Sequence, residues 1–352
     1  MMKMKKEGEL DMKQIVSNTS QVKRYNVEIV KNALKALPGG TKTTIARITG
    51  LSVATCNTIL NELDATGEIL EVINEYSNVG RPAKLYQFNE NYSYICCIYI
   101  SYENRKKLLN YAVVNLVGNI IKEESMIKEC IDYKQIENLV EELIDQYENI
   151  QSLGIGIPGV VNKHNVIDIC DICELAGCDL AQRLTDKFRM NVMIENDMNL
   201  IAYGVYQDGE YQEDTSIAVV AFYKDNWPGS GIIVDGHIIR GNTNFAGEVS
   251  FLPFGFTHEK QKELLKNRED IIQIVVKTVC SLTAIINPHT IVMTGTTLAD
   301  NMIEEIFSLT SEIIPKKHIP RILLKNNVQE YYLEGLSSMT LEYLNNPNRK
   351  LN

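Results

Sequence analysis

The chain has 352 residues, of which 45% are hydrophobic and 23% are charged, as in an ordinary globular protein with room for two or three domains. Its net charge of −10 excludes a basic coat over the whole surface, and the lack of any run of about 18 apolar residues excludes a membrane-spanning helix. Residues 1–90 hold 12 basic and 10 acidic side chains, which leaves 23 and 35 for the rest, so a slightly basic head precedes an acidic body.

The first twenty residues are polar, rich in lysine and without hydrophobic periodicity, which predicts a flexible arm over residues 1–20. They contain no apolar segment of the kind found in a secretory signal. We therefore expect a cytoplasmic protein whose eight cysteines are mostly free thiols in a reducing environment.

Three short helices are predicted after this arm. Apolar residues at helical spacing begin at Val27, and Pro38–Gly40 ends the first helix. The next two helices are predicted over Thr43–Thr49 and Ser52–Thr66. The segment Gly50-Leu51 separates them, as expected for two helices joined by a tight turn.

The second and third helices have the pattern of a helix-turn-helix. Ala46 is the small residue needed where the two helices touch, and Gly50 is the turn residue that tolerates a positive φ. Four apolar residues at spacings of three or four are expected to bury one face of the third helix. They are Val53, Cys56, Leu60 and Leu63.

The opposite face of the third helix carries short polar groups that can approach base edges, and asparagine can pair with adenine in the major groove. These predicted DNA contacts are Ser52, Thr55, Asn57, Thr58 and Asn61. Because this face has no arginine or lysine, we expect modest affinity and reliance on dimeric binding.

Two strands, Ile69–Ile73 and Leu85–Phe88, are predicted next, with a Gly- and Pro-containing hairpin tip between them. The tip adds Arg81 and Lys84 as predicted DNA contacts, since arginine in a thin loop suits a narrow minor groove. A generic small helical bundle shows similar spacing. The ordered set of helices, hairpin and arginine favours a winged helix-turn-helix over residues 21–90.

After Asn91 the pattern changes to an α/β one. Three strands, Tyr94–Ile100, Leu108–Leu116 and Gly118–Lys122, predict an antiparallel meander, and helices then alternate with strands. The helices are Ile136–Tyr147, Leu180–Phe188, Met198–Tyr206 and Asp270–Ile286, and the strands are Leu153–Ile157, Val192–Ile194, Ser216–Phe222, Gly231–Ile239 and Thr290–Met293. The alternation predicts an α/β fold in two lobes, and no internal repeat is visible in the sequence.

Several segments occur in the order found in one family. They are Gly154–Gly159, Glu195–Asn199, Gly231–Gly236, Arg240–Gly241, Phe245–Glu248 and Ile291–Gly295. Together with the head, they make the chain resemble the ROK family (repressors, open reading frames and sugar kinases), and within it the repressors of the xylose and N-acetylglucosamine type. The resemblance implies a two-lobed actin-like domain of the sugar kinase/ribonuclease H-like type over residues 91–352. Its lobes would be residues 91–196 plus the C-terminal helix, and residues 197–330.

The resemblance also implies a sugar site. Asp197 stands where the family's kinases have the base that accepts the sugar hydroxyl proton, and Asn196 and Glu248 stand at sugar-contacting positions. An alternative interpretation is that Asn196 and Asp197 simply cap the following helix.

Two glycine-rich turns that hold phosphates in the family's kinases are altered here. The first reads Ser101-Tyr102-Glu103-Asn104-Arg105 and lacks glycine, and the second has Trp227 and Pro228 in its first half. Phosphoryl transfer depends on such turns and on magnesium. We therefore expect no ATP binding, no catalytic residues and no enzyme activity.

Zinc is not expected either. The family's histidine that contacts zinc and sugar is replaced by Phe251, and the cysteine cluster expected nearby is replaced by Phe254–Lys266, which has no cysteine. Cys170, Cys173 and Cys178 have metal-like spacing but lack a fourth ligand unless His164 supplies it, so free or buried thiols are favoured. The expected set of metals and other cofactors is therefore empty.

The leading hypothesis is a transcriptional repressor of carbohydrate genes that binds a double-stranded DNA operator as a homodimer or other homo-oligomer. A sugar or sugar phosphate would act as its effector by changing the angle between the lobes. The first alternative is a working sugar kinase with a DNA-binding head. The second is a regulator whose ROK domain only dimerises.

Overall fold

The computed structural model describes residues 21–72, 84–103, 106–209, 211, 214–224 and 226–345. Two compact units make up the chain, Met1–Tyr92 and Ser93–Asn352. Among the described residues, no helix combines the length and the apolar character that crossing a bilayer requires.

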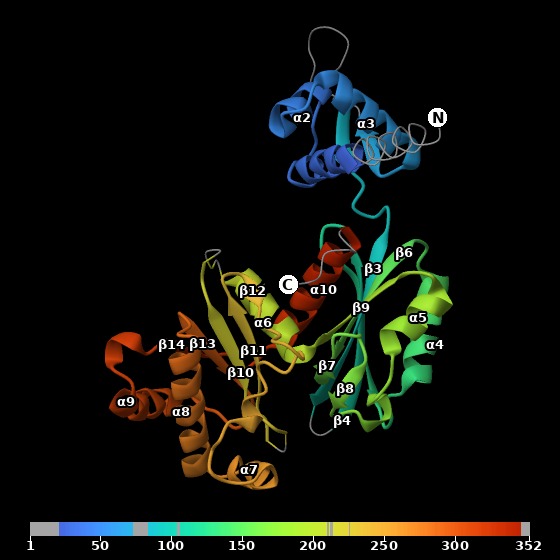
Figure 1. The fold of residues 1–352 in the computed structure, drawn as a ribbon. Helices are drawn as coiled ribbons and strands as arrows, with labels where there is room; N and C mark the ends of the chain where they lie inside the picture. The colour runs from blue at the N-terminus through green and yellow to red at the C-terminus, as the bar shows by residue number, and fades with distance from the viewer. Residues whose placement is uncertain are drawn as a thin grey trace, which may run out of the picture. The chain divides into compact units, whose positions relative to one another are not determined.

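The first unit consists of three helices and a small antiparallel sheet (Figure 1). Its elements are the helix of residues 21–35, α2 (Lys42–Thr49), α3 (Val53–Thr66), β1 (Ile69–Val72) and β2 (Leu85–Phe88). A β-bridge between Gly40 and Tyr86 fastens the connection after the first helix to this sheet. Buried Leu34, Ile45 and Leu60 join the three helices in one core.

Local signals explain the boundaries of α2 and α3. Thr41 and Ser52 accept hydrogen bonds from backbone N–H groups in the first turns of these helices, and so cap them. Gly50 ends α2 with a φ of 71°, the left-handed conformation that the predicted turn requires. Ala46 lies buried in the same core as Cys56, as the predicted contact between the helices demands.

One predicted core position in this unit is wrong. Val53 is 49% exposed, whereas the buried positions of α3 are Cys56, Ile59, Leu60 and Leu63. Val53 has the correct spacing, but it is the first residue of α3, directly after the cap. The core contacts begin one turn later, so this side chain is left outside them.

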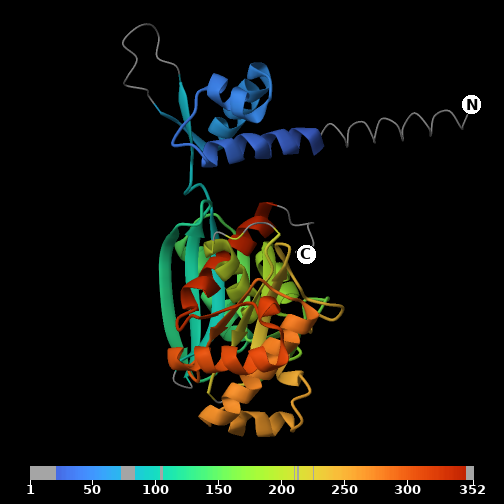
Figure 2. The ribbon, with the colours of Figure 1, turned by 90° about the vertical axis from the view of Figure 1, so that its left-hand side faces the viewer.

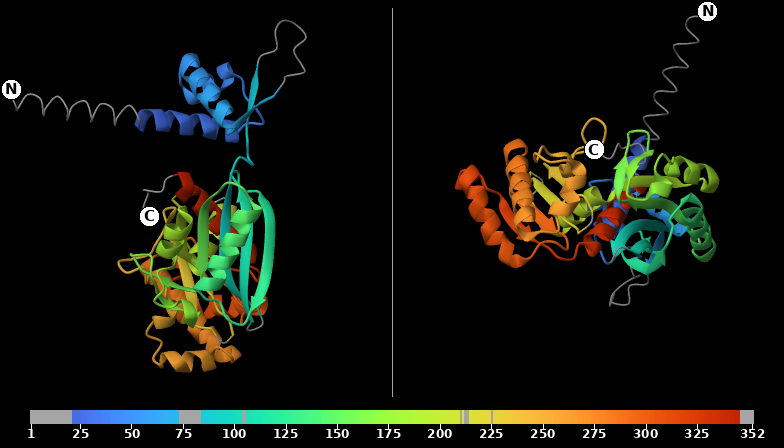
Figure 3. Two further views of the ribbon diagram at one scale, coloured as in Figure 1. Left: turned by 90° about the vertical axis from the view of Figure 1, so that its right-hand side faces the viewer. Right: turned by 90° about the horizontal axis from the view of Figure 1, so that it is seen from below.

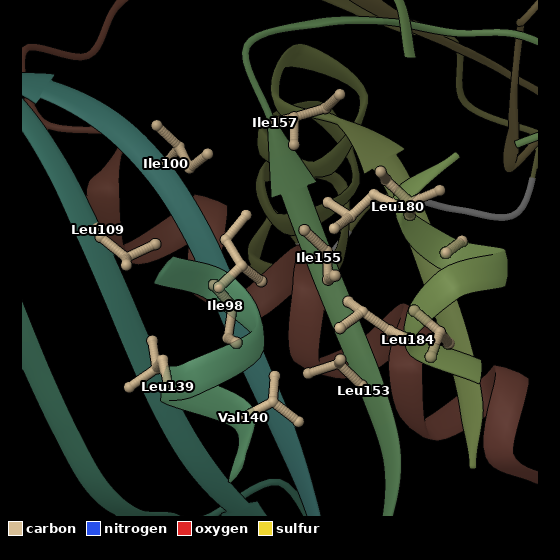
Figure 4. Packing of buried hydrophobic residues seen from close by; sticks show 14 of the residues in the cluster. Ile98, Ile100, Leu109, Leu139, Val140, Leu153, Ile155, Ile157, Leu180 and Leu184 are labelled. Carbon is tan, nitrogen blue, oxygen red and sulfur yellow. The ribbon is translucent and has the colours of Figure 1, made fainter. Parts of the chain in front are cut away.

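The first lobe of the second unit is a five-stranded sheet in the order β5-β4-β3-β6-β9. Its strands are β3 (Tyr94–Glu103), β4 (Lys106–Asn115), β5 (Ile120–Lys128), β6 (Ile150–Ile157) and β9 (Asn191–Asn196). β3, β4 and β5 form the predicted antiparallel meander, while β6 and β9 are parallel to β3. The helices α4 (Tyr133–Gln146) and α5 (Leu180–Phe188) cover one face, as Figure 3 shows (left). Figure 4 shows Ile98, Leu139 and Leu184 in the core between them.

The second lobe repeats this topology. Its sheet has the order β12-β11-β10-β13-β14, again with an antiparallel meander on one side and two parallel strands on the other. The strands are β10 (Ile217–Ala221), β11 (Gly229–Val234), β12 (His237–Ile238), β13 (Thr290–Thr294) and β14 (Arg321–Leu324). The helices α8 (Arg268–Ile285) and α9 (Ile303–Ile313) cover its outer face (Figure 2). The two lobes therefore share one topology, although the sequence contains no visible internal repeat.

Two helices, α6 (Asp197–Asp208) and α10 (Gln329–Asn345), fill the space between the sheets (Figure 3, right). Their backbones approach very closely, because a Cβ at Gly204 would lie 2.0 Å from the carbonyl oxygen of Tyr331. Residues of both sheets join these helices in one hydrophobic core. The inner faces of the two lobes thus share a single packed layer.

The sequence missed several smaller elements. These are β7 (Gly159–Val161), β8 (Ile167–Cys170), α7 (His258–Leu264) and the 3-10 helices η1 (Cys173–Leu175), η2 (Val249–Phe251), η3 (Asp300–Met302) and η4 (Lys316–His318), together with α9 and β14. The predicted strand Gly231–Ile239 is in fact a hairpin of β11 and β12. Asp235 and Gly236 turn the chain there, both at positive φ.

Candidate ligand site and DNA-contacting face

Three of the five DNA contacts predicted at the start and along the polar face of α3 are exposed to solvent, and two are half-buried. Ser52, Thr58 and Asn61 are exposed, whereas Thr55 and Asn57 are half-buried. The hydroxyl groups of Ser52 and Thr55 lie 2.8 Å apart, and that of Thr58 donates to the carbonyl of Ala54. These local hydrogen bonds keep the hydroxyl groups of Ser52, Thr55 and Thr58 close to the helix backbone.

Two further predicted contacts are engaged within the chain. The side-chain oxygen of Asn57 accepts a hydrogen bond from Lys42, at the start of α2. Lys84 forms an ion pair of 2.5 Å with Glu71 across the β1–β2 hairpin, and this bond raises the pKa of the lysine. Arg81 lies outside the described residues. The sequence did not single out Lys42, a basic residue beside the polar face of α3.

Asn196 and Asp197 stand at the junction between β9 and α6. Asn196 caps α6, because its side-chain oxygen accepts from the backbone of Asn199 at 3.0 Å, and its amide donates to the carbonyl of Gly159 at 2.9 Å. Asn196 therefore does cap α6, while its predicted sugar contact stays a prediction. Asp197 accepts from the backbone of Met198 with one oxygen, at 2.8 Å.

The backbone of β11 brings Glu248 into the neighbourhood of Asp197. A Cβ at Gly231 would lie 2.0 Å from the carbonyl oxygen of Met198, so β11 touches the first turn of α6 directly. Its neighbour Ser230 donates to the carbonyl of Gly247, once from the backbone and once from the hydroxyl group. Only glycine allows such approaches. Glu248 follows at the start of η2.

Three carboxylates interact at this place. Burial, together with the negative charges of Asp171 and then Glu248, raises the pKa of Asp197 to about 8. Burial and the charge of Asp171 also raise the pKa of Glu248. Burial raises the pKa of Asp171 as well, although its side chain is accessible to solvent. Carboxyl groups that are partly buried but still reachable from solvent can recognise the hydroxyl groups of a ligand. They accept hydrogen bonds when ionised and can also donate one when protonated.

Sequence reasoning missed Asp171. It follows β8, and its backbone N–H donates to the carbonyl of Pro158 at 3.0 Å, next to the Gly159 that binds Asn196. The resemblance gave no motif there, and the hairpin β7–β8 that carries it was not predicted. No local signal in the sequence points to its role.

Aromatic packing holds the segment before β11, which the sequence predicts to be an altered phosphate turn. The Trp227 indole stacks on the His258 ring at 4.5 Å and donates to the His258 carbonyl, and Nζ of Lys262 lies over the indole, 3.5 Å from the ring centre. Phe251 stacks on the same histidine at 4.5 Å. The rings of Trp227, His258 and Phe251 thus stack in a row.

The residues at the expected zinc position do not fit that metal, since Phe251 offers a phenyl ring and Phe254–Lys266 has no thiol. In the cysteine-rich segment, Cys170 accepts from the backbone of Ile172, and Cys178 accepts from Arg183. Within the described ranges, no three His, Cys, Asp or Glu side chains are grouped so that they could hold a metal ion.

Sequence comparison relates the second unit to a known family. The profile of the ROK family matches residues 106–260. A xylose repressor from Bacillus subtilis is 23% identical over 254 residues, which are 70% of this chain and 64% of the repressor. A xylose repressor from Caldicellulosiruptor bescii is 25% identical over 251 residues, 68% of this chain and 61% of the repressor. The chain thus spans a little under two thirds of these repressors.

Other relatives are kinases. An N-acetyl-D-glucosamine kinase from Yersinia pseudotuberculosis is 31% identical over 124 residues, 34% of this chain and 40% of the kinase.

Solved structures share the fold. A ROK family transcriptional regulator, a homolog of the E. coli MLC protein, has a TM-score of 0.65 at 15% identity and covers 91% of this chain and 99% of its own. A ROK family glucokinase from Streptomyces griseus has a TM-score of 0.56 at 14% identity, covering 71% of this chain and 100% of its own. Residues 106–260 of this chain therefore match the ROK family, the second unit is similar in sequence to xylose repressors, and the solved structures share its fold.

Proposed function

We propose that this protein is a DNA-binding transcriptional repressor of carbohydrate genes. In this proposal the first unit is a winged helix-turn-helix that binds an operator as part of a homodimer. The ROK domain binds a sugar or sugar phosphate without turning it over. The relatives named as xylose repressors make a pentose such as D-xylose the first effector to test.

The observation that carries the proposal is the exposed polar face of α3. Ser52, Thr58 and Asn61 face solvent at the start and along one side of α3, whose other side is buried. Gly50, in the left-handed conformation, forms the tight turn that connects α2 to α3. Second helices of this kind enter the major groove with their N-terminal residues. Val53 adds an exposed apolar group at that end, suited to a thymine methyl group.

The acidic site supports the ligand-binding part of the proposal. Asp197 and Glu248 occupy the positions at which the resemblance implies sugar contacts, and the fold brings them together with Asp171. Ring-borne hydroxyl groups are suitable partners for such carboxyl groups. Asn196 can contact a ligand only with the hydrogen-bonding capacity that remains after its side chain caps α6 and binds the carbonyl of Gly159.

A salt-titrated mobility-shift assay tests the DNA-binding part, using duplexes selected by the protein from a random library. We expect binding to a preferred sequence that is at least about 1,000-fold tighter than to random DNA, as specific regulators show. Equal affinity for selected and random duplexes at every salt concentration would refute DNA reading.

A kinase is the second candidate, favoured by the position of Asp197 and by the kinase relatives. The stacked Trp227 opposes it, since an indole held by His258 and Lys262 leaves no glycine-rich cradle for phosphates. We expect no ADP release with ATP, magnesium and a panel of sugars. Turnover that disappears in Asp197→Asn would establish the kinase instead.

A ROK domain that only dimerises is the third candidate. It is favoured by Asn196, because its side-chain oxygen and its amide group both form hydrogen bonds within the protein. A thermal-shift screen with pentoses, hexoses, amino sugars and their phosphates separates it from the main proposal. One stabilising sugar, with the effect lost in Glu248→Gln, supports sensing, whereas a panel without any effect favours dimerisation alone.

A further inference from the structure

The segment Arg240–Asn244 links the two lobes of the ROK domain. It follows β12 in the second lobe, but its side chains reach the first. The guanidinium of Arg240 donates to one oxygen of Glu195, at the end of β9, from Nε at 2.9 Å and from Nη2 at 2.7 Å. Two donors on one carboxylate oxygen hold both the distance and the orientation of the segment.

Two more hydrogen bonds reinforce this link. The amide of Asn244 donates to the carbonyl of Val161, in β7 of the first lobe, at 2.7 Å. Lys163, just beyond β7, donates to the side-chain oxygen of Asn242 at 3.0 Å. Three separate side chains of one five-residue segment therefore bind three separate positions of the opposite lobe.

Glu195 connects this link to the candidate ligand site. Its second oxygen accepts from the backbone N–H of Asn196 and from the side chain of Asn199, both at 2.9 Å. One carboxylate thus binds Arg240 on one side and the first turn of α6 on the other. That turn begins with Asp197.

The same segment also leads into Glu248. The backbone N–H of Ala246 donates to the carbonyl of Arg240, which closes the loop, and Gly247 is bound by Ser230 of β11. Glu248 comes next. Its place relative to Asp197 depends on β11 and on the contacts of the loop with the first lobe.

The ion pair at the centre of these contacts is buried. The exposed fractions of the Arg240 and Glu195 side chains are 14% and 9%, against 49% and 45% for the surface pair of Arg268 and Glu305. A buried charge that loses its partner is costly, whereas the surface pair contributes little. If the lobes separate, water can hydrate both charges, so the pair distinguishes closed lobes from open ones.

We propose that the contacts of Arg240, Asn242 and Asn244 with Glu195, Lys163 and Val161 form an interlobe clasp that controls closure of the ROK domain around its ligand. Arg240 and Glu195 act as positioning residues that need not touch the ligand. This inference rests on the proposed sugar site for its functional meaning. The clasp itself can be tested without any ligand.

Hydrogen-exchange mass spectrometry on the full chain without ligand tests the clasp. In Arg240→Gln we expect exchange in peptides covering residues 196–202 and 241–248 to rise at least about tenfold, since a buried charge loses its partner. Peptides from β10 and β13, in the core of the second lobe, should exchange as in the unaltered protein. Arg268→Gln is the matched control and should leave all these peptides unchanged.

Two outcomes would overturn the clasp. Unchanged exchange in both peptides means that the contacts do not restrain the lobes. Faster exchange throughout both lobes means that the pair only supports the fold. Should Arg240→Gln fail to fold, Asn244→Ala removes an uncharged contact instead and is expected to raise exchange in the same two peptides about threefold.

A double-mutant cycle and a ligand titration complete the test. Glu195→Gln and Arg240→Gln should be non-additive in the exchange of residues 241–248, because each removes the same pair. For D-xylose and D-glucose, Arg240→Gln should weaken binding at least about fivefold, while Arg268→Gln should not. Unchanged sugar affinity in Arg240→Gln would refute control of closure. If neither sugar binds the unaltered protein, the proposed sensing fails for these probes, and the exchange data still decide the clasp.

Discussion

Asp197 holds its proton more tightly in the folded protein than in the unfolded chain, because burial and the neighbouring carboxylates raise its pKa to about 8. A carboxyl group in an unfolded chain has a pKa of about 4. The folded state therefore binds one more proton between these values. The contribution of Asp197 to stability must therefore decline as pH rises from about 4 to about 8.

Replacing Asp197 by asparagine removes this titration. One pKa unit corresponds to about 1.4 kcal/mol, and about one unit of a half-sized shift lies above pH 5. Even half of the shift would therefore widen the stability difference between Asp197→Asn and the unaltered protein by about 1.4 kcal/mol from pH 5 to pH 8.5. Urea unfolding at the two pH values measures this. Asp145→Asn, on the exposed side of α4, is the control and should leave the difference unchanged. The same difference at both pH values for Asp197→Asn would contradict the burial of this charge.

Asn61 is the side chain on which direct base reading by α3 depends most, since Asn57 is already bound by Lys42. A lost bidentate contact to a base costs about 1–3 kcal/mol. We therefore expect Asn61→Ala to weaken binding to the selected operator by roughly 5- to 150-fold, with unchanged melting temperature. Asn32→Ala, exposed on the helix of residues 21–35, should have no effect. Equal losses in both variants would rule out reading by α3.

At the scale of elements, α6 and α10 cross in direct backbone contact. Gly204 faces the carbonyl of Tyr331, and Gly335 faces the carbonyl of Leu200, each with room for no side chain. Because backbone atoms cannot rotate away, any added carbon must push the helices apart. Both sheets pack against this pair, so the shift would reach both lobes.

Gly204→Ala tests this packing. Alanine favours a helix by about 1 kcal/mol over glycine, while overpacking costs about 3 kcal/mol, so we expect a net loss of about 2 kcal/mol. Urea unfolding measures it. Glu334→Ala, on the exposed side of α10, should change stability by less than about 0.5 kcal/mol. A stabilised Gly204→Ala protein would show that the helices are not in this contact.

At the scale of the whole molecule, the proposed function requires that sugar and operator affect each other's binding. Thermodynamic linkage makes the effect reciprocal, so a sugar that changes operator affinity must have its own affinity changed by the same factor. We expect a factor of roughly 5 to 150. Calorimetry of D-xylose, or of any sugar found in the thermal-shift screen, with and without operator duplex measures one side, and the shift assay measures the other. A sugar that binds equally well in both conditions is no effector.

The repeated topology of the two lobes belongs to this scale as well. Each lobe has a meander followed by two parallel strands, but their sequences show no common period. Strand pairing depends on alternating burial and backbone bonds, which many sequences satisfy. The shared topology can therefore be recognised in the structure but not in the sequence.

The sequence by itself determined the elements whose signals are local. β2 and α5 begin and end at the predicted residues, and α3 differs by its capping residue only, because caps, glycines and hydrophobic period act within a few residues. The family motifs likewise located Asp197 and Glu248, since each lies in a short recognisable segment. All the predicted DNA contacts stay predictions, as do the three sugar contacts.

Tertiary structure alone decided what depends on residues far apart in the chain. Glu195 and Arg240 are 45 positions apart, and Asp171 reaches the site from a hairpin that was not predicted. Val53 had the spacing of a core residue, yet its side chain is 49% exposed. Spacing reports which face of an element a residue occupies, but what covers that face, and which charges meet there, is fixed only when distant segments pack together.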